Sequence, residues 1–379
     1  MRFLEDGGLM IQSRILVNRT KEMATFCLVT KREIPMAKLE FLQRYPLKGF
    51  PGQRLEKAEL DVGKGLDWDR HFAILSGAAT EEPIAGGFIK AVNFIQNTYT
   101  DDLQKFSTDI DFDQELIGLT SFDGTKVEFD LTDPESWQKS SEVLRGWFTA
   151  GDKNPRLVRQ APAKGHWDFT DSNLSLLNLA SHRMLESHYY HSMDPVRHRS
   201  NLHVEFDKPW VEFELLGKRF KLGEAEFEAF RPAKRCATIS VDPKTGERDL
   251  NLAGLMQADF GHAFLGIYCR VVKSGSIKAG DSLEILGEAL GEYPVPFNAP
   301  RPELWPRLAN LDSGSLTFEQ NEHPEIAQAE QGTLRLHTIG KEVSWYKCRI
   351  ERHSNSHEIE LGPESAEIEN GRYLVTGPF

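Results

Sequence analysis

The sequence predicts a mainly β protein with a few helices, in the α+β class. Short segments that alternate apolar and polar residues recur through most of the 379 residues, separated by Gly, Asp and Pro. Clear helical spacing of apolar residues is confined to two segments, at 134–148 and 170–190. Apolar residues make up 40% of the chain, enough to fill the cores of two or three compact units. We therefore expect barrels or sandwiches of short strands, with few helices.

The first 160 residues divide near residue 33. Residues 1–33 read as an extension whose apolar run FCLVT, at 26–30, can pair as an additional strand. Residues 34–160 contain short alternating segments such as HFAIL and VEFDL, which indicate a β-rich domain. Its helical segment, 134–148, places four apolar side chains on one face. These are Trp137, Val143, Leu144 and Trp147.

The rest of the chain divides near residue 290. In 161–290 a helix is expected over 170–190, because apolar residues repeat at three and four after a Thr-Asp-Ser-Asn start that suits an N-cap. Alternating strands such as WVEFELL, CATISV and SLEIL follow. In 291–379 a connector with five prolines precedes further alternating segments, which predict a small β-rich module.

Composition limits the partners of this chain. Its net charge of −12 argues against nucleic acid and anionic membranes, because both attract positive proteins. No stretch approaches the roughly 20 apolar residues that span a bilayer, and the acidic amino terminus does not resemble a signal peptide. The four cysteines lack the spacing of a disulfide framework, a zinc ribbon or an iron–sulfur cluster. We expect a cytoplasmic protein with reduced thiols.

Cys236 is the first candidate for chemistry. It follows Lys234 and Arg235, and neighbouring cations favour the thiolate, which is the form that attacks or binds metal. A buried cysteine at the start of the strand CATISV explains the same residues, so both interpretations stay open. A nucleophilic pair with His262 is a further alternative. His188 and His191 could share a helix face, but no carboxylate or cysteine completes a metal site there.

The residues around Cys236 resemble a known family. The stretch RCATISVDPKTGERD, followed by MQADFGHAFLGIYCRVVKSGSIKAGDSLEIL, is similar to the core of the MOSC domain. That module occurs in molybdenum cofactor sulfurases and in the mitochondrial amidoxime-reducing component. Upstream, AKLEFLQRYPLKG and WDRHFAIL resemble the β-barrel that precedes it, so the resemblance covers about residues 36–286. Ser240 departs from the pattern, where a Thr is common.

The resemblance implies a molybdenum cofactor, Mo-molybdopterin, with Cys236 as the metal ligand and a catalytic residue. It implies that cations hold the phosphate and the pterin of the cofactor. It also places an acidic residue, Asp171, at a helix start beside the metal, where it would position a metal-bound water or relay a proton. The cofactor-binding residues would be Lys48, Arg70, Ser172, Asn173, Arg199, Arg235 and Cys236.

Ordinary structural roles explain several of these residues equally well. Asp171 can simply cap its helix, and Lys48 and Arg70 can be solvated surface charges. The neighbours Arg197 and His198 leave the assignment of Arg199 uncertain by a residue or two.

The resemblance implies an oxidoreductase, independent of pyridoxal phosphate, that reduces N-hydroxylated small molecules. Electrons would come from a separate flavin or iron–sulfur protein, because the chain shows neither a cysteine set for a cluster nor a dinucleotide-binding glycine motif. An alternative is a carrier of molybdenum cofactor, or of sulfur as a persulfide on Cys236. A third interpretation is a β-rich scaffold without cofactor, in which Cys236 is a core thiol.

Overall fold

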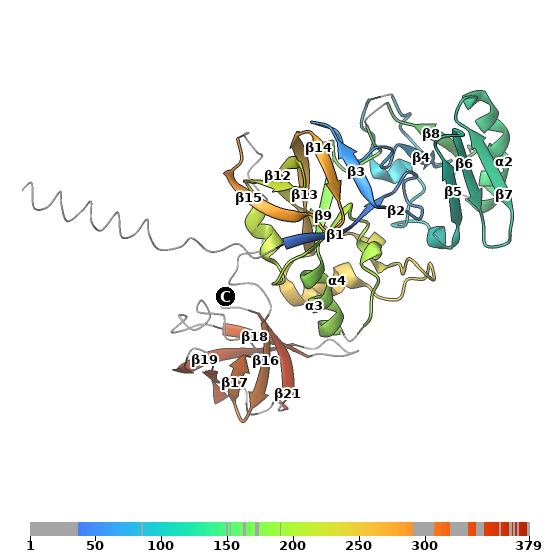
Figure 1. Ribbon diagram of the computed structural model, residues 1–379. Helices are drawn as coiled ribbons and strands as arrows, with labels where there is room; N and C mark the ends of the chain where they lie inside the picture. Colours follow the sequence, from blue (N-terminus) through green and yellow to red (C-terminus); the bar gives the residue numbers. More distant parts are fainter. Residues whose placement is uncertain are drawn as a thin grey trace, which may run out of the picture. The chain divides into compact units, whose positions relative to one another are not determined.

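The computed structural model describes most of the chain from residue 37 onward (Figure 1). The described residues belong to one unit, Met36–Phe379. The expected strand at 26–30 and the proline-rich connector lie outside the described residues. So do 85, 149–150, 152, 162–163, 171–173, 190, 291–306, 319–332, 339–344, 356–357, 364–365, 367, 370 and 377–379.

A closed ring of seven strands forms the centre of the fold, which confirms the prediction of a mainly β protein with a β-barrel. Neighbouring strands are antiparallel except for one parallel pair, β9 and β10. In ring order the strands are β1 (Ala37–Arg44), β15 (Ser282–Glu288), β11 (Lys218–Leu222), β12 (Ala225–Lys234), β13 (Phe264–Lys273), β9 (Leu174–Asn178) and β10 (Leu202–Glu205), which pairs back with β1. The short strand β2 (Gln53–Leu55) pairs with the other end of β1.

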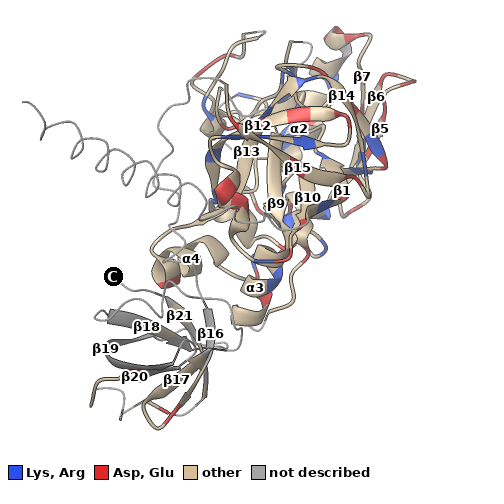
Figure 2. Cartoon of the chain, turned by 60° about the vertical axis from the view of Figure 1, so that its left-hand side comes forward, with Lys and Arg blue, Asp and Glu red and all other residues tan. Residues whose placement is uncertain are grey.

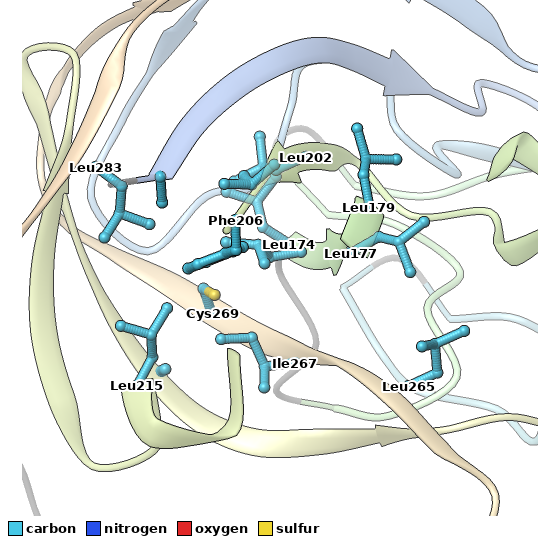
Figure 3. Packing of buried hydrophobic residues seen from close by; sticks show 14 of the residues in the cluster. Leu174, Leu177, Leu179, Leu202, Phe206, Leu215, Leu265, Ile267, Cys269 and Leu283 are labelled. Atoms are coloured by element: carbon cyan, nitrogen blue, oxygen red, sulfur yellow. The ribbon is translucent and has the colours of Figure 1, made fainter. Parts of the chain in front are cut away.

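The ring encloses an apolar core. Alternate side chains point inward along a strand, so the alternation seen in the sequence becomes one buried face. Figure 3 shows the sulfur of Cys269 among Leu174, Phe206 and Ile267 in this core. The strand β1 belongs to the ring, although the sequence analysis assigned its residues to the amino-terminal domain.

Residues 57–160 build smaller sheets around a second core. Strand β3 (Lys57–Leu60) pairs with β14 (Gly275–Lys278), and β4 (Phe72–Leu75) pairs with β8 (Arg156–Arg159). The remaining strands form a meander, and short 3₁₀ helices and one α-helix complete this part. The strands of the meander are β5 (Ser107–Asp111), β6 (Leu116–Thr120) and β7 (Lys126–Asp130). The α-helix is α2 (Ser141–Trp147), and the 3₁₀ helices are η1 (Ala91–Asn93), η2 (Leu103–Lys105) and η3 (Pro134–Ser140).

The helix expected over 170–190 is only half correct. Residues Leu174–Asn178 form β9, and α3 (Leu179–Tyr189) begins directly after it. All five residues of β9 are buried. The strand is part of the ring, with β10 on one side and β13 on the other. A fully buried strand is apolar without a break, and spacing alone does not distinguish it from a buried helix.

Further helices and a second barrel complete the described part. The helix α4 (Leu252–Phe260) follows the Cys236 segment, and the 3₁₀ helices are η4 (Pro195–His198), η5 (Val211–Leu215) and η6 (Ala237–Ser240). The carboxyl-terminal module, expected to be β-rich, forms a closed barrel of its own. Its strands are β16 (Arg307–Asp312), β17 (Ser315–Phe318), β18 (Thr333–Thr338), β19 (Trp345–Asn355), β20 (Glu358–Leu361) and β21 (Gly371–Thr376).

Charges of both signs are interspersed over the described elements (Figure 2). Among these residues, no helix combines the length and the apolar character that crossing a bilayer requires.

The central position of β9 makes a testable prediction. Leu176 is fully buried and lies in register with Leu202 and Ile267. We expect Leu176→Ala to lower the free energy of unfolding by about 2–5 kcal/mol, the range for a deleted core leucine. Leu290 is 80% exposed, and Leu290→Ala should change it by less than about 0.5 kcal/mol. Urea denaturation checks both, and equal small effects would contradict the assignment of β9 to the core.

Candidate functional site

One cleft brings together residues from both parts of the main unit. From residues 37–168 it is lined by Lys48, Gly49, Asp69, Arg70, Gln96, Asn97, Trp167 and Asp168; from the ring and its loops, by Leu174, Ser175, His198, Arg199, Asn201, Lys234, Arg235, Cys236, Thr238, Ile239 and Tyr268. The cavity volume of the cleft is about 90 Å³. The cleft is therefore narrow.

The sulfur of Cys236 is exposed at this cleft. Cys236 follows β12 and precedes η6, in an extended conformation with φ −116°. Its Sγ lies 3.3 Å from Oγ1 of Thr238 and 3.7 Å from Oγ1 of Thr98, and the two hydroxyl oxygens are 2.8 Å apart. By contrast, Cys269 is fully buried in the ring, and burial raises the pKa of its thiol. The exposure of Cys236 argues against its interpretation as a core thiol.

Lys48 reaches the cleft from the loop after β1. Its side chain is only 7% exposed, so it is not the solvated surface charge that composition alone suggests. Nζ donates to Oδ1 of Asp168 at 2.5 Å and to the carbonyl of His166 at 2.9 Å. Burial raises the pKa of Asp168, but the charge and hydrogen bond of Lys48 outweigh it and lower the pKa overall. Asp168 is therefore a carboxylate at neutral pH.

Arg70 and Arg199 share the ring of a buried tyrosine. The guanidinium carbons lie 4.8 Å and 4.2 Å from the ring centroid of Tyr45. Arg70 donates to Oδ2 of Asp69 at 2.5 Å and to the carbonyl of Arg199 at 2.7 Å. Arg199 donates from Nη1 to the carbonyl of Phe50, whereas its Nη2 is buried and without a partner in the described part of the chain.

Strand register explains why Tyr45 and Arg199 meet. In the antiparallel pair of β1 and β10, Leu42 lies opposite Leu202. Tyr45 comes three residues after Leu42, and Arg199 comes three residues before Leu202. The same register therefore places Tyr45 opposite Arg199, at the cleft. Arg70 joins them because its backbone N–H donates to the carbonyl of Tyr45 at 2.7 Å.

Both arginines have a strained backbone. Arg70 has φ 54° and Arg199 has φ 53°, in the left-handed region that costs a non-glycine residue about 1–2 kcal/mol. Burial lowers the pKa of Arg199 to about 10. Burial also opposes the charge on Arg70, but the charge and hydrogen bond of Asp69 together raise its pKa. Both guanidinium groups are protonated at neutral pH, and such strain is typical of functional sites.

Arg235 is fully engaged by the protein. It donates from Nε to the carbonyl of Leu265 at 2.7 Å, from Nη1 to the carbonyl of His198 at 2.8 Å, and from Nη2 to Oγ of Ser200 at 3.2 Å. Burial lowers its pKa. These bonds hold the backbone directly before Cys236 against two other segments, so Arg235 positions the sulfur.

The structure distinguishes Arg199 from Arg197. Arg197 is not part of the cleft lining; it donates to the carbonyl of Ile239 at 3.0 Å and pairs with Asp249. His191 binds the other oxygen of Asp249 at 2.8 Å.

The histidine alternatives find no support. Among the described residues, no group of three or more metal-ligating side chains is assembled. His188 lies 3.0 Å from a carboxylate oxygen of Asp259, which is part of a buried contact rather than a metal site. His262 packs among Trp210, Phe260 and Phe264 and does not line the cleft with Cys236.

Asp171, Ser172 and Asn173 lie outside the described residues, so their predicted roles stay predictions. The sequence analysis missed Tyr45, Asp69, Asp168 and Thr98. Asp69 precedes Arg70 directly, and this adjacency was the only signal available for it. Thr98 is far from Cys236 in sequence, and nothing around it indicates the contact.

Close packing behind Arg235 makes a second prediction. Gly266 has φ 75°, and a Cβ there would lie 2.3 Å from the carbonyl oxygen of Leu176 and 3.0 Å from Nη2 of Arg235. Gly261 has a similar φ of 73° with nothing within 4 Å of such a Cβ. We expect Gly266→Ala to cost roughly 2 kcal/mol or more, and Gly261→Ala about 1 kcal/mol. Equal losses in urea denaturation would refute the crowding.

Part of this chain is similar to known proteins. The family model of the MOSC domain matches residues 146–284. Two proteins named molybdenum cofactor sulfurase are similar to this chain: that of Caenorhabditis briggsae is 37% identical over 101 residues, and that of Caenorhabditis elegans is 35% identical over 102 residues. Each match covers 26% of this chain and only 14% of the relative.

Among solved structures, the YUAD protein from Bacillus subtilis is 12% identical, with a TM-score of 0.32. The match covers 67% of this chain and 97% of that one. The segment that carries Cys236 and most strands of the seven-stranded ring lie within residues 146–284. This chain therefore contains a MOSC domain.

Proposed function

We propose that this chain binds molybdenum cofactor in the cleft and reduces N-hydroxylated compounds with it. One observation carries the proposal: a single cleft holds the exposed sulfur of Cys236 together with Lys48, Arg70 and Arg199. The MOSC domain and the sulfurase relatives support a function related to this cofactor. In this proposal residues 34–160 supply Lys48 and Arg70, and residues 161–290 supply the sulfur.

The chemistry of the residues fits the cofactor. Molybdopterin carries a phosphate at one end and binds its metal through soft sulfurs at the other, so a receptor needs cations and a soft ligand. The buried Nη2 of Arg199 has no partner in the described part of the chain, and an unmade hydrogen bond of a buried charged group is costly. A phosphate oxygen would supply the missing acceptor. The exposed Sγ of Cys236 would supply the soft ligand.

Each residue of the cleft then has a role of its own. Arg70 and Arg199 bind the phosphate as a pair held by the ring of Tyr45, and Lys48 contributes a third positive charge. Arg235 holds the backbone that presents the sulfur. When bound, the cofactor would supply the two-electron chemistry for reduction of the N–O bond. Asp171, beside the metal by resemblance, would deliver a proton to the departing nitrogen, and Ser172 and Asn173 would contact the pterin.

The reaction needs electrons from another protein. We propose a separate flavin or iron–sulfur partner, and a small N-hydroxylated molecule as the substrate, in the cytoplasm, where thiols stay reduced. The exposure of Cys236 and the relatives named as sulfurases favour a second candidate, a carrier of the cofactor or of sulfur as a persulfide. Turnover of a hydroxylamine or an amidoxime by the loaded protein, with an artificial reductant, distinguishes the two functions.

Removal of the sulfur tests the ligand assignment. The wild type and Cys236→Ser are expressed with cofactor available, and molybdenum and oxidised pterin are measured in each purified protein. We expect molybdenum to fall at least tenfold in the variant, because a hydroxyl is a poor ligand for a soft site. Cys269→Ala is the matched control, since it removes a cysteine from the core and not from the cleft. Equal molybdenum in wild type and Cys236→Ser would remove Cys236 from the metal site.

Removal of one cation tests the anion site. Arg199→Gln keeps a long polar side chain without the charge, and we expect affinity for a phosphorylated pterin to fall about 10- to 100-fold. Arg54→Gln is the control, because Arg54 carries the same charge but stacks on Phe41 outside the cleft. Fluorescence titration of the pterin measures both. An equal, small effect of the two variants would contradict phosphate binding at Arg199.

A further inference from the structure

The segment of residues 96–101 lies along one side of the cleft. Gln96 and Asn97 line it, and the hydroxyl of Thr98 reaches the Cys236 loop, 2.8 Å from Oγ1 of Thr238. Both ends of the segment are anchored, because Ile95 and Leu103 are buried in the second core. Between these anchors the residues belong to no strand or helix.

One arginine connects this segment to the Cys236 loop. Arg248 donates from Nε to Oδ1 of Asp101 at 2.7 Å and from Nη2 to the carbonyl of Asn97. Its Nη1 donates at 3.2 Å to the carbonyl of Ala237, the residue after Cys236. A single planar guanidinium therefore bonds both sides of the cleft at once.

These contacts hold the segment weakly. The side chain of Arg248 is 32% exposed and that of Asp101 is 72% exposed, so water screens their attraction. The nearby pair of Lys105 and Glu247 is longer, at 3.4 Å, and also exposed. A segment outside regular structure and held by such bonds opens at low free energy.

The cleft is too narrow for a large ligand as it stands. Its cavity volume is about 90 Å³, whereas pockets for drug-sized ligands usually measure about 300–1,000 Å³. The side formed by residues 96–101 lacks regular structure, and the bond from Arg248 to Asp101 on this side is exposed.

We propose that Arg248 is a positioning residue that holds residues 96–101 beside Cys236, and that release of its bonds widens the cleft for a ligand of the size of a phosphorylated pterin. The identity of that ligand rests on the proposed function. The contact of Arg248 with both sides of the cleft does not.

The size of a thiol reagent that reaches Cys236 tests this proposal without any cofactor. The full-length protein reacts with N-ethylmaleimide or with a maleimide that carries a long polyethylene glycol chain, and peptide mass spectrometry measures labelling at Cys236 alone. We expect Arg248→Gln to raise the ratio of bulky to small labelling roughly fivefold or more, because the bulky reagent needs the open cleft. Arg248→Lys keeps the charge and should restore part of the wild-type ratio.

A matched control separates this role from a general loss of stability. Arg183 forms a similar exposed pair with Glu205 outside the cleft, so Arg183→Gln should leave the ratio unchanged. Asp101→Asn removes the negative charge that attracts Arg248 from the other side and should raise the ratio less than Arg248→Gln. It also gives the answer if Arg248→Gln does not fold. An unchanged ratio in folded Arg248→Gln overturns the proposal. If Arg248→Gln does not fold, an unchanged ratio in Asp101→Asn overturns it.

Cofactor loading separates failure of this inference from failure of the proposed function. If the wild type takes up no molybdenum, the function fails while the labelling result still decides the role of Arg248. If the wild type takes up molybdenum, Arg248→Gln should both bind and release the phosphorylated pterin faster than the wild type.

Discussion

Two like charges packed against one buried ring are the constraint on which the cleft depends. Arg70 and Arg199 both face Tyr45, and Asp69 is the buried carboxylate that pairs with one of them. Two cations at close range repel each other, so the surrounding carbonyls and the ring must offset that cost. An anion in the cleft would relieve the repulsion that remains. The strained backbone of both arginines is consistent with an arrangement kept for binding and not for stability.

Closure of the seven-stranded ring creates this constraint. Strand β1 pairs with β15 on one side and β10 on the other, and the β1–β10 register carries Tyr45 to Arg199. Lys48 follows in the same loop, and Arg70 is bonded to the backbone of Tyr45. On the other side of the cleft, β12 delivers Cys236, and Arg235 ties the strand end to the segment that carries Arg199. One ring therefore positions the sulfur and the cations together.

Local chemistry explains which predictions from the sequence succeeded. Alternation at period two indicated the strands, and it holds wherever one face of a strand meets solvent. It did not identify β9, whose residues are buried on both faces. The charge next to Cys236 suggested a reactive sulfur, but the same residues allowed a core thiol, and the exposure of Cys236 was needed to decide. Arg235 was expected to bind cofactor, whereas its hydrogen bonds fall on the protein itself.

The class of the fold, the motif around Cys236 and its similarity to the MOSC core could be read from the residues alone, because these features depend on residues that lie close together in the chain. Only the tertiary structure decided that Lys48, Arg70 and Arg199 meet at one cleft, that Tyr45 lies between two of them, and that Thr98 and Arg248 connect its two sides. Those contacts join segments up to about 150 residues apart. Their positions follow from ring closure and strand register, which local spacing does not encode.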